Sequence, residues 1–198
     1  MNKPDIHRLI DFHRLLVRFA SIQRRVHRPQ GKEFVNENDT EHSYNLAMTA
    51  WFLAAYFPEL DRDKLIRFAL IHDLVEIHAG DTFFYGSQRE MKSKKQRETA
   101  AIEQLAADWP DFPELTAQIE DYETHASEEA KFIYALDKLM PMLLVYLGDG
   151  YSWKHEGVTL EQQHTAKKPK TAVSKQIDDY YDQMHQLLLQ NRHLFPKP

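Results

Sequence analysis

Apolar residues recur at helical spacing at the start of the chain. Between Ile6 and Val26 most of them stand three or four residues apart, which predicts one amphipathic helix. The residues of this stripe are Leu9, Ile10, Phe12, Leu16, Phe19 and Ile22. The segment Pro29–Gly31 ends the helix, because proline and glycine interrupt regular structure.

The same periodicity, together with capping residues and breakers, predicts helices along the rest of the chain. They cover about 42–57, a stretch from a cap at Asp61 or Asp63 to Gly80, then 89–108, a short helix before Ser127, 127–147 and 171–189. The third helix carries Leu65, Phe68, Ala69, His72 and Glu76 along one side. The stretch 151–170 is expected to be irregular, and no segment alternates long enough to predict a sheet. The pattern therefore predicts an all-α protein.

Size and composition agree with one domain over residues 1–198, since 198 residues suffice for a full core. No apolar run approaches the roughly 18 residues that would span a bilayer, and the first residues lack the apolar stretch of a signal peptide. The chain has no cysteine, which excludes disulfides and thiolate metal ligands, so a cytoplasmic location is expected. No membrane partner is therefore expected, and a net charge of −5 argues against binding to long nucleic acid.

The strongest indication of chemistry is the pair His72-Asp73 inside an otherwise apolar helix. Burying an imidazole beside a carboxylate is costly unless a partner compensates both, and a divalent cation would do so. His42, at the start of the second helix, and Asp137, inside the apolar run 132–140, offer two more ligands. Together the four side chains form an N2O2 set from three helices. Such a set leaves coordination positions open for water and substrate, as in catalytic metal sites.

The order and wording of these motifs resemble the HD superfamily of metal-dependent phosphohydrolases, in the branch of the 5′-deoxynucleotidases. The resemblance rests on the segments 40–43 (Thr-Glu-His-Ser), 72–81 (His-Asp-Leu-Val-Glu-Ile-His-Ala-Gly-Asp), 129–131 (Glu-Ala-Lys) and 135–138 (Ala-Leu-Asp-Lys). It covers about residues 10–147, so that 148–198 would be a helical C-terminal extension of the same HD domain. It implies metal ligation by His42, His72, Asp73 and Asp137, and hydrolysis of a phosphomonoester, with a nucleoside or deoxynucleoside 5′-monophosphate as the expected substrate.

The resemblance also implies roles for three further residues. Glu76 would orient or deprotonate the attacking water, and Asp81 would assist the leaving alkoxide or position the nucleophile. Arg25 falls where the deoxynucleotidases place a phosphate-binding arginine, although Arg24 or Arg28 can also be the counterpart. Val26 and His27 follow Arg25, where a bulky residue that rejects the ribose 2′-hydroxyl would be expected. The ribose or deoxyribose preference therefore stays open.

Two imidazoles in the ligand set favour Mn²⁺, Co²⁺ or Fe²⁺ over Mg²⁺, and Zn²⁺ also fits. One ion is expected, because His78 lies off the ligand stripe and His125 falls in an expected loop before Ser127, and both are interpreted as structural. The relatives imply a homodimer, for which the aromatic residues Tyr180 and Tyr181 of the last helix would suit an interface. The alternative function is a catalytically weak HD module that binds a nucleotide or takes part in signalling.

Overall fold

The computed structural model describes residues 3–80 and 88–197, and the side chains of residues 88–95 lie outside that description. Its helices are α1 (Ile6–Ala20), α2 (Asp39–Ala54), α3 (Arg62–Ile71), α4 (Glu76–Ala79), α5 (Gln88–Asp108), α6 (Pro113–Glu123), α7 (Glu128–Leu147), α8 (Tyr151–His155), α9 (Leu160–Thr171) and α10 (Lys175–Gln190), followed by the 3₁₀ turn η1 (Arg192–Leu194). Two strands, β1 (Gln23–Gln30) and β2 (Glu33–Asn38), precede α2. None of the described helices is long and apolar enough to cross a membrane.

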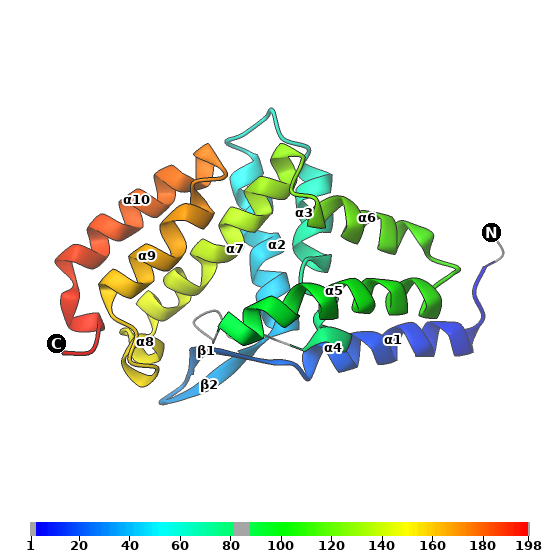
Figure 1. The fold of residues 1–198 in the computed structure, drawn as a ribbon, viewed down its shortest axis with the longest axis horizontal. Coiled ribbons are helices and arrows are strands. Elements are labelled where there is room, and N and C mark those ends of the chain that lie inside the picture. The colour runs from blue at the N-terminus through cyan, green and yellow to red at the C-terminus, as the bar shows by residue number, and fades with distance from the viewer. Residues whose placement is uncertain (1–2, 81–87, 198) are drawn as a thin grey trace.

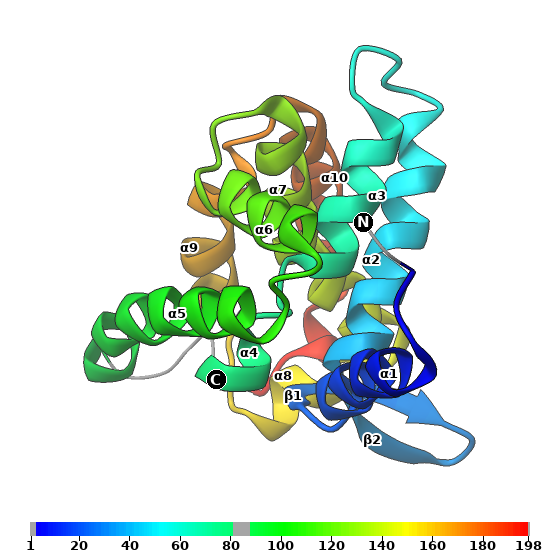
Figure 2. The ribbon, with the colours of Figure 1, turned by 90° about the vertical axis from the view of Figure 1, so that its right-hand side faces the viewer.

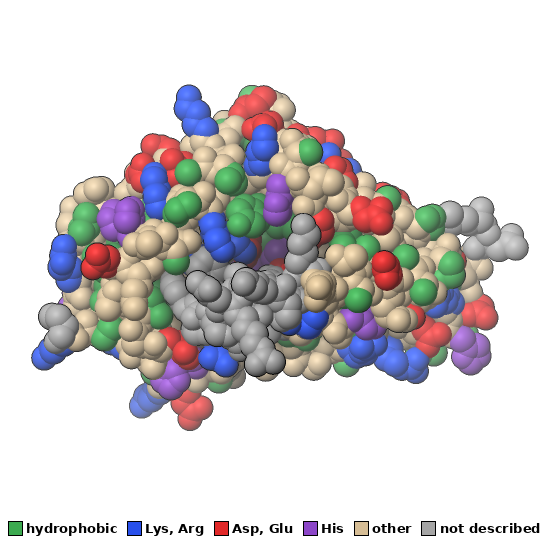
Figure 3. Space-filling model, in the orientation of Figure 1, with side chains coloured by type: hydrophobic (Ala, Val, Ile, Leu, Met, Phe, Trp, Pro, Cys, Tyr) green, Lys and Arg blue, Asp and Glu red, His purple; other side chains and the backbone are tan. Residues whose placement is uncertain are grey.

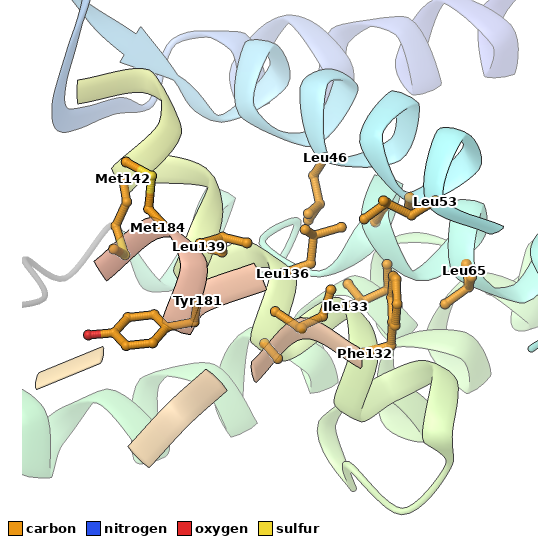
Figure 4. Packing of buried hydrophobic residues seen from close by; sticks show 14 of the residues in the cluster. Leu46, Leu53, Leu65, Phe132, Ile133, Leu136, Leu139, Met142, Tyr181 and Met184 are labelled. Atoms are coloured by element: carbon orange, nitrogen blue, oxygen red, sulfur yellow. The ribbon is translucent and has the colours of Figure 1, made fainter. Parts of the chain in front are cut away.

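Helix α7 runs through the middle of the molecule, with α2 and α3 on one side and α9 and α10 on the other (Figure 1). Ser127 caps its N-terminus by accepting from the N–H of Ala130. Figure 4 shows apolar side chains of α7 between those of α2 and those of α10. Leu46, Phe132, Leu136 and Tyr181 are fully buried in this main core. Because α7 is buried from several sides, a polar residue inside it lies at the centre of the fold.

A second, smaller core lies between α1, α4, α5 and α6. It contains Leu15 and Phe19 of α1 together with Leu74 and Val75, which join α3 to α4. Helix α1 packs across one end of α2 (Figure 2). Ile71 packs against both cores. The segment that contains His72 and Asp73 is therefore held from two directions.

The expectation that the chain contains no sheet was wrong, because β1 and β2 form an antiparallel hairpin. The first helix ends at Ala20 instead of continuing to Val26. The hairpin turns through a two-residue loop that begins with Gly31 at φ +63°, a conformation that glycine adopts without strain. A register irregularity lies between Gln23 and His27. The hairpin is fixed to α8, since the His27 N–H donates to Ser152 Oγ at 2.8 Å.

Four other expectations along the chain need correction. The third helix is interrupted: α3 ends at Ile71, and the turns that follow carry i→i+3 bonds such as Glu76 N–H to Asp73 O before α4 begins. The stretch expected to be irregular forms α8 and α9, and the last helix starts at Lys175 instead of residue 171. Tyr181 is fully buried, so it is not available for a subunit interface.

Candidate metal site

Four side chains that the sequence selects as metal ligands meet in the structure. His42 of α2, His72 and Asp73 after α3, and Asp137 of α7 each offer one ligand atom, and these atoms all lie within 4.8 Å of one another. His42, His72 and Asp137 are buried, and Asp73 keeps 18% of its side chain exposed. Distances of this size between donor atoms suit ligands around a single ion.

The first turn of α2 fixes His42. Asn38 caps the helix by accepting from the N–H of Glu41, and Glu41 accepts in return from the N–H of Asn38, which forms a capping box. Since β2 ends at Asn38 and α2 starts at the next residue, the polar stretch 36–41 forms the end of the strand and the first turn of the helix. His42 Nε2 lies 2.9 Å from Asp137 Oδ1.

The imidazole of His72 is oriented by the backbone. Its Nδ1 lies 2.9 Å from the carbonyl oxygen of Ala69, and because a carbonyl only accepts, Nδ1 must carry the proton. Its Nε2 therefore presents a lone pair. This atom is buried, lies 3.0 Å from Asp73 Oδ2 and has no hydrogen-bond partner among the described residues. A buried lone pair beside two carboxylates fits a divalent cation, and such histidines usually donate their other ring N–H in this way.

Glu37 is a member of the site that the sequence analysis did not select. It is 2% exposed, and its Oε2 lies 3.3 Å from His42 Nδ1. A carboxylate on the far nitrogen of a ligand histidine fixes the tautomer and makes the coordinating nitrogen more basic. Burial and Arg24 lower the pKa of His42, but the carboxylates of Asp137 and Glu37 outweigh them and raise that pKa.

The structure brings Arg24, and not Arg25, to the four candidate ligands. Neighbouring residues of a strand point to opposite faces, so only one of the two can face the site. Arg24 Nη1 donates to Asp73 Oδ2 at 2.6 Å and to Asp39 Oδ1 at 3.2 Å, whereas Arg25 is exposed. Arg28 pairs with Glu41 at 2.7 Å. Burial lowers the pKa of Arg24, and the surrounding carboxylates, led by Asp73 and Asp137, raise it well above its usual range.

Asp137 has a cationic partner of its own. From helical geometry Lys138 is expected to point away from Asp137, yet its Nζ donates to Asp137 Oδ2 at 2.5 Å. The long lysine side chain folds back over its neighbour. Burial raises the pKa of Asp137, but Lys138 and the hydrogen bond from His42 hold it well below its usual range. Asp73 also has a lowered pKa, because the imidazole of His72, when it is protonated, and the guanidinium of Arg24 outweigh its burial. Both carboxylates are therefore ionised and able to bind a cation.

The remaining candidates differ in position. Glu76 is the first residue of α4, is 5% exposed, and acts on Arg24 as one of the surrounding negative charges. Asp81 lies outside the described residues. His78 is 3.6 Å from Asp108, and His125 packs against the rings of Tyr122 and Tyr134, so neither belongs to the four-residue group.

The surface near these side chains has a mixed polar character. One face of the molecule, shown in Figure 3, carries lysine or arginine, histidine and acidic side chains among hydrophobic ones. Arg24 and Lys138 keep 14% and 19% of their side chains exposed, similar to Asp73. These charged side chains are therefore largely buried, but each keeps part of its surface exposed.

The amino-acid sequence of this chain is similar to those of known proteins. A family model described as HD domain matches residues 21–178. The 5′-deoxynucleotidase HDDC2 of Mus musculus is 35% identical over 104 residues, which are 52% of this chain and 51% of that protein. The protein of the same name from Homo sapiens is 31% identical over 133 residues, 66% of this chain and 60% of that protein. The matched region thus spans about half to three fifths of the length of these curated relatives.

A solved structure extends the likeness to nearly the whole chain. It is described as a "Predicted metal-dependent phosphohydrolase" from Magnetospirillum magnetotacticum. Its TM-score to this chain is 0.78, at 31% sequence identity, and the match covers 96% of both chains. The likeness includes the C-terminal helices that the sequence motifs do not reach.

Proposed function

The chain belongs to the HD-domain family, and on that premise we propose that it is a metal-dependent phosphohydrolase that cleaves a nucleoside 5′-monophosphate. The observation that carries the proposal is the convergence of His42, His72, Asp73 and Asp137, whose ligand atoms lie within 4.8 Å of one another. The orphaned Nε2 of His72 supports the same assignment. Relatives named 5′-deoxynucleotidase favour a phosphomonoester of a nucleoside as the substrate.

The four side chains would hold one divalent ion, with Mn²⁺, Co²⁺ or Fe²⁺ favoured over Mg²⁺ and with Zn²⁺ also fitting two imidazoles and two carboxylates. When bound, the ion would act as a Lewis acid on the phosphate and would make a nearby water easier to deprotonate. Glu37 would keep His42 in the coordinating tautomer. The backbone carbonyl of Ala69 would do the same for His72.

The other residues of the site would handle the water and the phosphate. Glu76 is buried at the start of α4, four residues after His72, and would orient the attacking water and accept its proton. Arg24 would contact the phosphate oxygens, in the role that the sequence analysis gave first to Arg25. The proposed assistance of Asp81 to the leaving alkoxide remains a prediction outside the described residues.

A homodimer and a cytoplasmic location also stay predictions. Exposed apolar side chains on α2 suit a subunit interface better than the buried Tyr181: Tyr44, Met48, Trp51 and Phe52 are 44–64% exposed and repeat at helical spacing on one face. Contiguous apolar surface of this kind marks interaction sites in soluble proteins. Sedimentation of the wild type and of Trp51→Glu tests this, since a dimer through α2 would dissociate in the variant.

The decisive experiment measures phosphate release after the chain is stripped of metal and reloaded with Mn²⁺, Co²⁺, Fe²⁺, Zn²⁺ or Mg²⁺ separately. The panel contains ribo- and deoxyribonucleoside 5′-monophosphates, the 3′-isomers, a phosphodiester and nucleoside triphosphates. We expect metal-dependent release from 5′-monophosphates and little action on triphosphates. Asp137→Ala should lose both ion and activity. Nucleotide binding without hydrolysis under every metal would support the alternative, a binding or signalling module, and would refute the enzyme.

A further inference from the structure

Two aromatic side chains, His125 and Tyr134, lie against each other beside the candidate metal site. The centroids of their rings are 4.5 Å apart, and the ring planes are inclined by 53°. His125 belongs to the connection between α6 and α7, and Tyr134 lies on α7. Both residues are half-buried, whereas an aromatic residue that fills the core, such as Phe132, is fully buried. Part of this aromatic pair (His125 and Tyr134) therefore remains at the surface.

Tyr134 shares one face of α7 with a candidate metal ligand. Asp137 and Lys138 follow it by three and four residues, the spacing at which side chains of a helix are neighbours. Lys138 Nζ donates to Asp137 Oδ2 at 2.5 Å and lies 5.1 Å from the centroid of the Tyr134 ring. The phenol ring is therefore placed about one helical turn from the ligand carboxylate.

His125 is connected to a second candidate ligand through Tyr122. The buried Tyr122 ring meets the His125 ring edge-on at 5.3 Å and the His72 ring edge-on at 6.2 Å, both measured between centroids. His125 also has a backbone φ of +47°, in the left-handed region where glycine is the usual residue. A histidine there is strained relative to glycine, and such residues concentrate at functional sites. The backbone therefore also indicates that the side chain of His125 has a function.

We propose that the aromatic pair binds the base of a nucleoside 5′-monophosphate by stacking, while the phosphate lies at the metal site. The inference rests on the proposed function. In such a substrate the sugar separates the base from the phosphate, so a site for the base must lie beside the metal site and not within it, as the aromatic pair does. Tyrosine and histidine rings are common stacking partners of unpaired bases. Stacking uses the π-face that every base has, so purines and pyrimidines should both be accepted.

The test compares substrates with and without a base. Ribose 5-phosphate and 2-deoxyribose 5-phosphate contain the phosphate and the sugar of the matching nucleotide and lack only the base. For the Mn²⁺-loaded wild type, kcat/KM for the nucleoside 5′-monophosphate should exceed kcat/KM for the matching sugar phosphate about 5- to 150-fold, as expected for stacking of one base. A ratio of about one would overturn the inference without any variant.

Variants in the full chain assign this ratio to the aromatic pair. Tyr134→Ala and His125→Asn each remove one ring, and asparagine tolerates the left-handed backbone at residue 125. Each should lower the ratio of the two kcat/KM values about 5- to 150-fold, mainly through KM for the nucleotide. Tyr134→Phe keeps the ring and should retain the ratio. If the rings only supported the fold, both substrates would lose kcat/KM equally, and an unchanged ratio in both ring-removing variants would overturn the inference.

Tyr56→Ala is the matched control. Tyr56 is 62% exposed and follows the end of α2, fourteen residues after His42, which corresponds to about 20 Å along a helix. The control removes a tyrosine ring far from the candidate metal site, so it should retain the ratio of the wild type. A loss of the ratio in Tyr56→Ala as large as in Tyr134→Ala would contradict the assignment to the aromatic pair.

The inference and the proposed function fail in different ways. If wild type hydrolyses nucleoside 5′-monophosphates and the sugar phosphates equally well, only the role of the aromatic pair is refuted. If metal-loaded wild type hydrolyses no phosphomonoester, the proposed function fails, and calorimetric titration with a nucleoside 5′-monophosphate decides on the aromatic pair. Binding that is about 5- to 150-fold weaker in Tyr134→Ala than in wild type would support it. Equal binding by both, or binding by neither, would overturn it.

Discussion

Two single variants, Arg24→Met and Arg25→Met, distinguish an arginine of the candidate site from its neighbour in the sequence. Both substitutions remove one positive charge from β1 and differ by one position. The two side chains point to opposite faces of the strand, so the structure predicts opposite outcomes.

The magnitude follows from the surroundings of the guanidinium. Four carboxylates lie within 4 Å of Arg24: Asp73 at 2.6 Å, Asp39 at 3.2 Å, Glu37 at 3.7 Å and Asp137 at 3.9 Å. Removing one partner of a buried ion pair typically costs about 3–5 kcal/mol, because the other charge is left uncompensated. Without metal, Arg24→Met should therefore lower the free energy of unfolding by an amount in that range. With metal the loss should be smaller, since the ion would compensate the charges of Asp73 and Asp137. Arg25→Met should change stability by less than about 0.5 kcal/mol.

The assay is urea unfolding of both variants and wild type, with and without saturating Mn²⁺, followed by steady-state kinetics on a nucleoside 5′-monophosphate. Loss of a preorganised phosphate contact should lower kcat/KM of Arg24→Met about 10²- to 10³-fold. Arg25→Met should remain within about 2-fold of wild type, since it lies on the exposed face. If Arg25→Met loses activity while Arg24→Met keeps it, the placement of the phosphate contact on Arg24 is wrong.

Three further outcomes are expected. Glu76→Gln should lower kcat roughly 10²- to 10⁴-fold with the ion content unchanged, and loss of the ion would instead make Glu76 a ligand. Glu37→Gln should weaken metal binding about 10- to 100-fold through His42, which a competition titration with a chelator measures; unchanged affinity contradicts that role. Because folding lowers the pKa of Lys167 to about 7, the native chain binds fewer protons than the unfolded chain between pH 7 and 10. The metal-free wild type should therefore gain about 1.4 kcal/mol of stability per pH unit there, relative to Lys167→Met. Parallel pH profiles of unfolding would refute this.

The part of the fold that could be predicted from the sequence is the part with apolar periodicity. Helices α2, α5 and α7 were expected within a few residues of their observed bounds, because apolar stripes and caps such as Ser127 define them. Helix α9 was not expected, and the reason is physical. Its buried face carries Gln163, Lys167 and Thr171, so the period of burial does not appear as a period of hydrophobicity. A helix whose buried face is polar cannot be recognised by that criterion.

The candidate site also has residues that could be predicted from the sequence and residues that could not. The sequence could select His42, His72, Asp73 and Asp137, since each is an unusual residue in its context and the family motif orders them. It could not choose between Arg24 and Arg25, because that choice depends on which face of β1 points inward. The hairpin had been interpreted as the end of a helix, where no such alternation exists. Glu37 was missed for the same reason, although its place just before the cap of α2 is a usable signal.

Under the proposed function, the contacts of Asp73 would link the metal to the substrate. Arg24 donates to Asp73 Oδ2, and the same oxygen is 3.0 Å from His72 Nε2. An ion bound by His72 and Asp73 would share the negative charge of Asp73 that Arg24 now neutralises. Arg24 would then interact less strongly with its carboxylates. A phosphate beside the ion would then supply the negative charge that Arg24 lacks. Linkage is reciprocal, so whatever the ion adds to phosphate affinity, phosphate must add to ion affinity. If Arg24 exchanges its partner, from a ligand carboxylate to the substrate, the metal and the phosphate would therefore bind cooperatively.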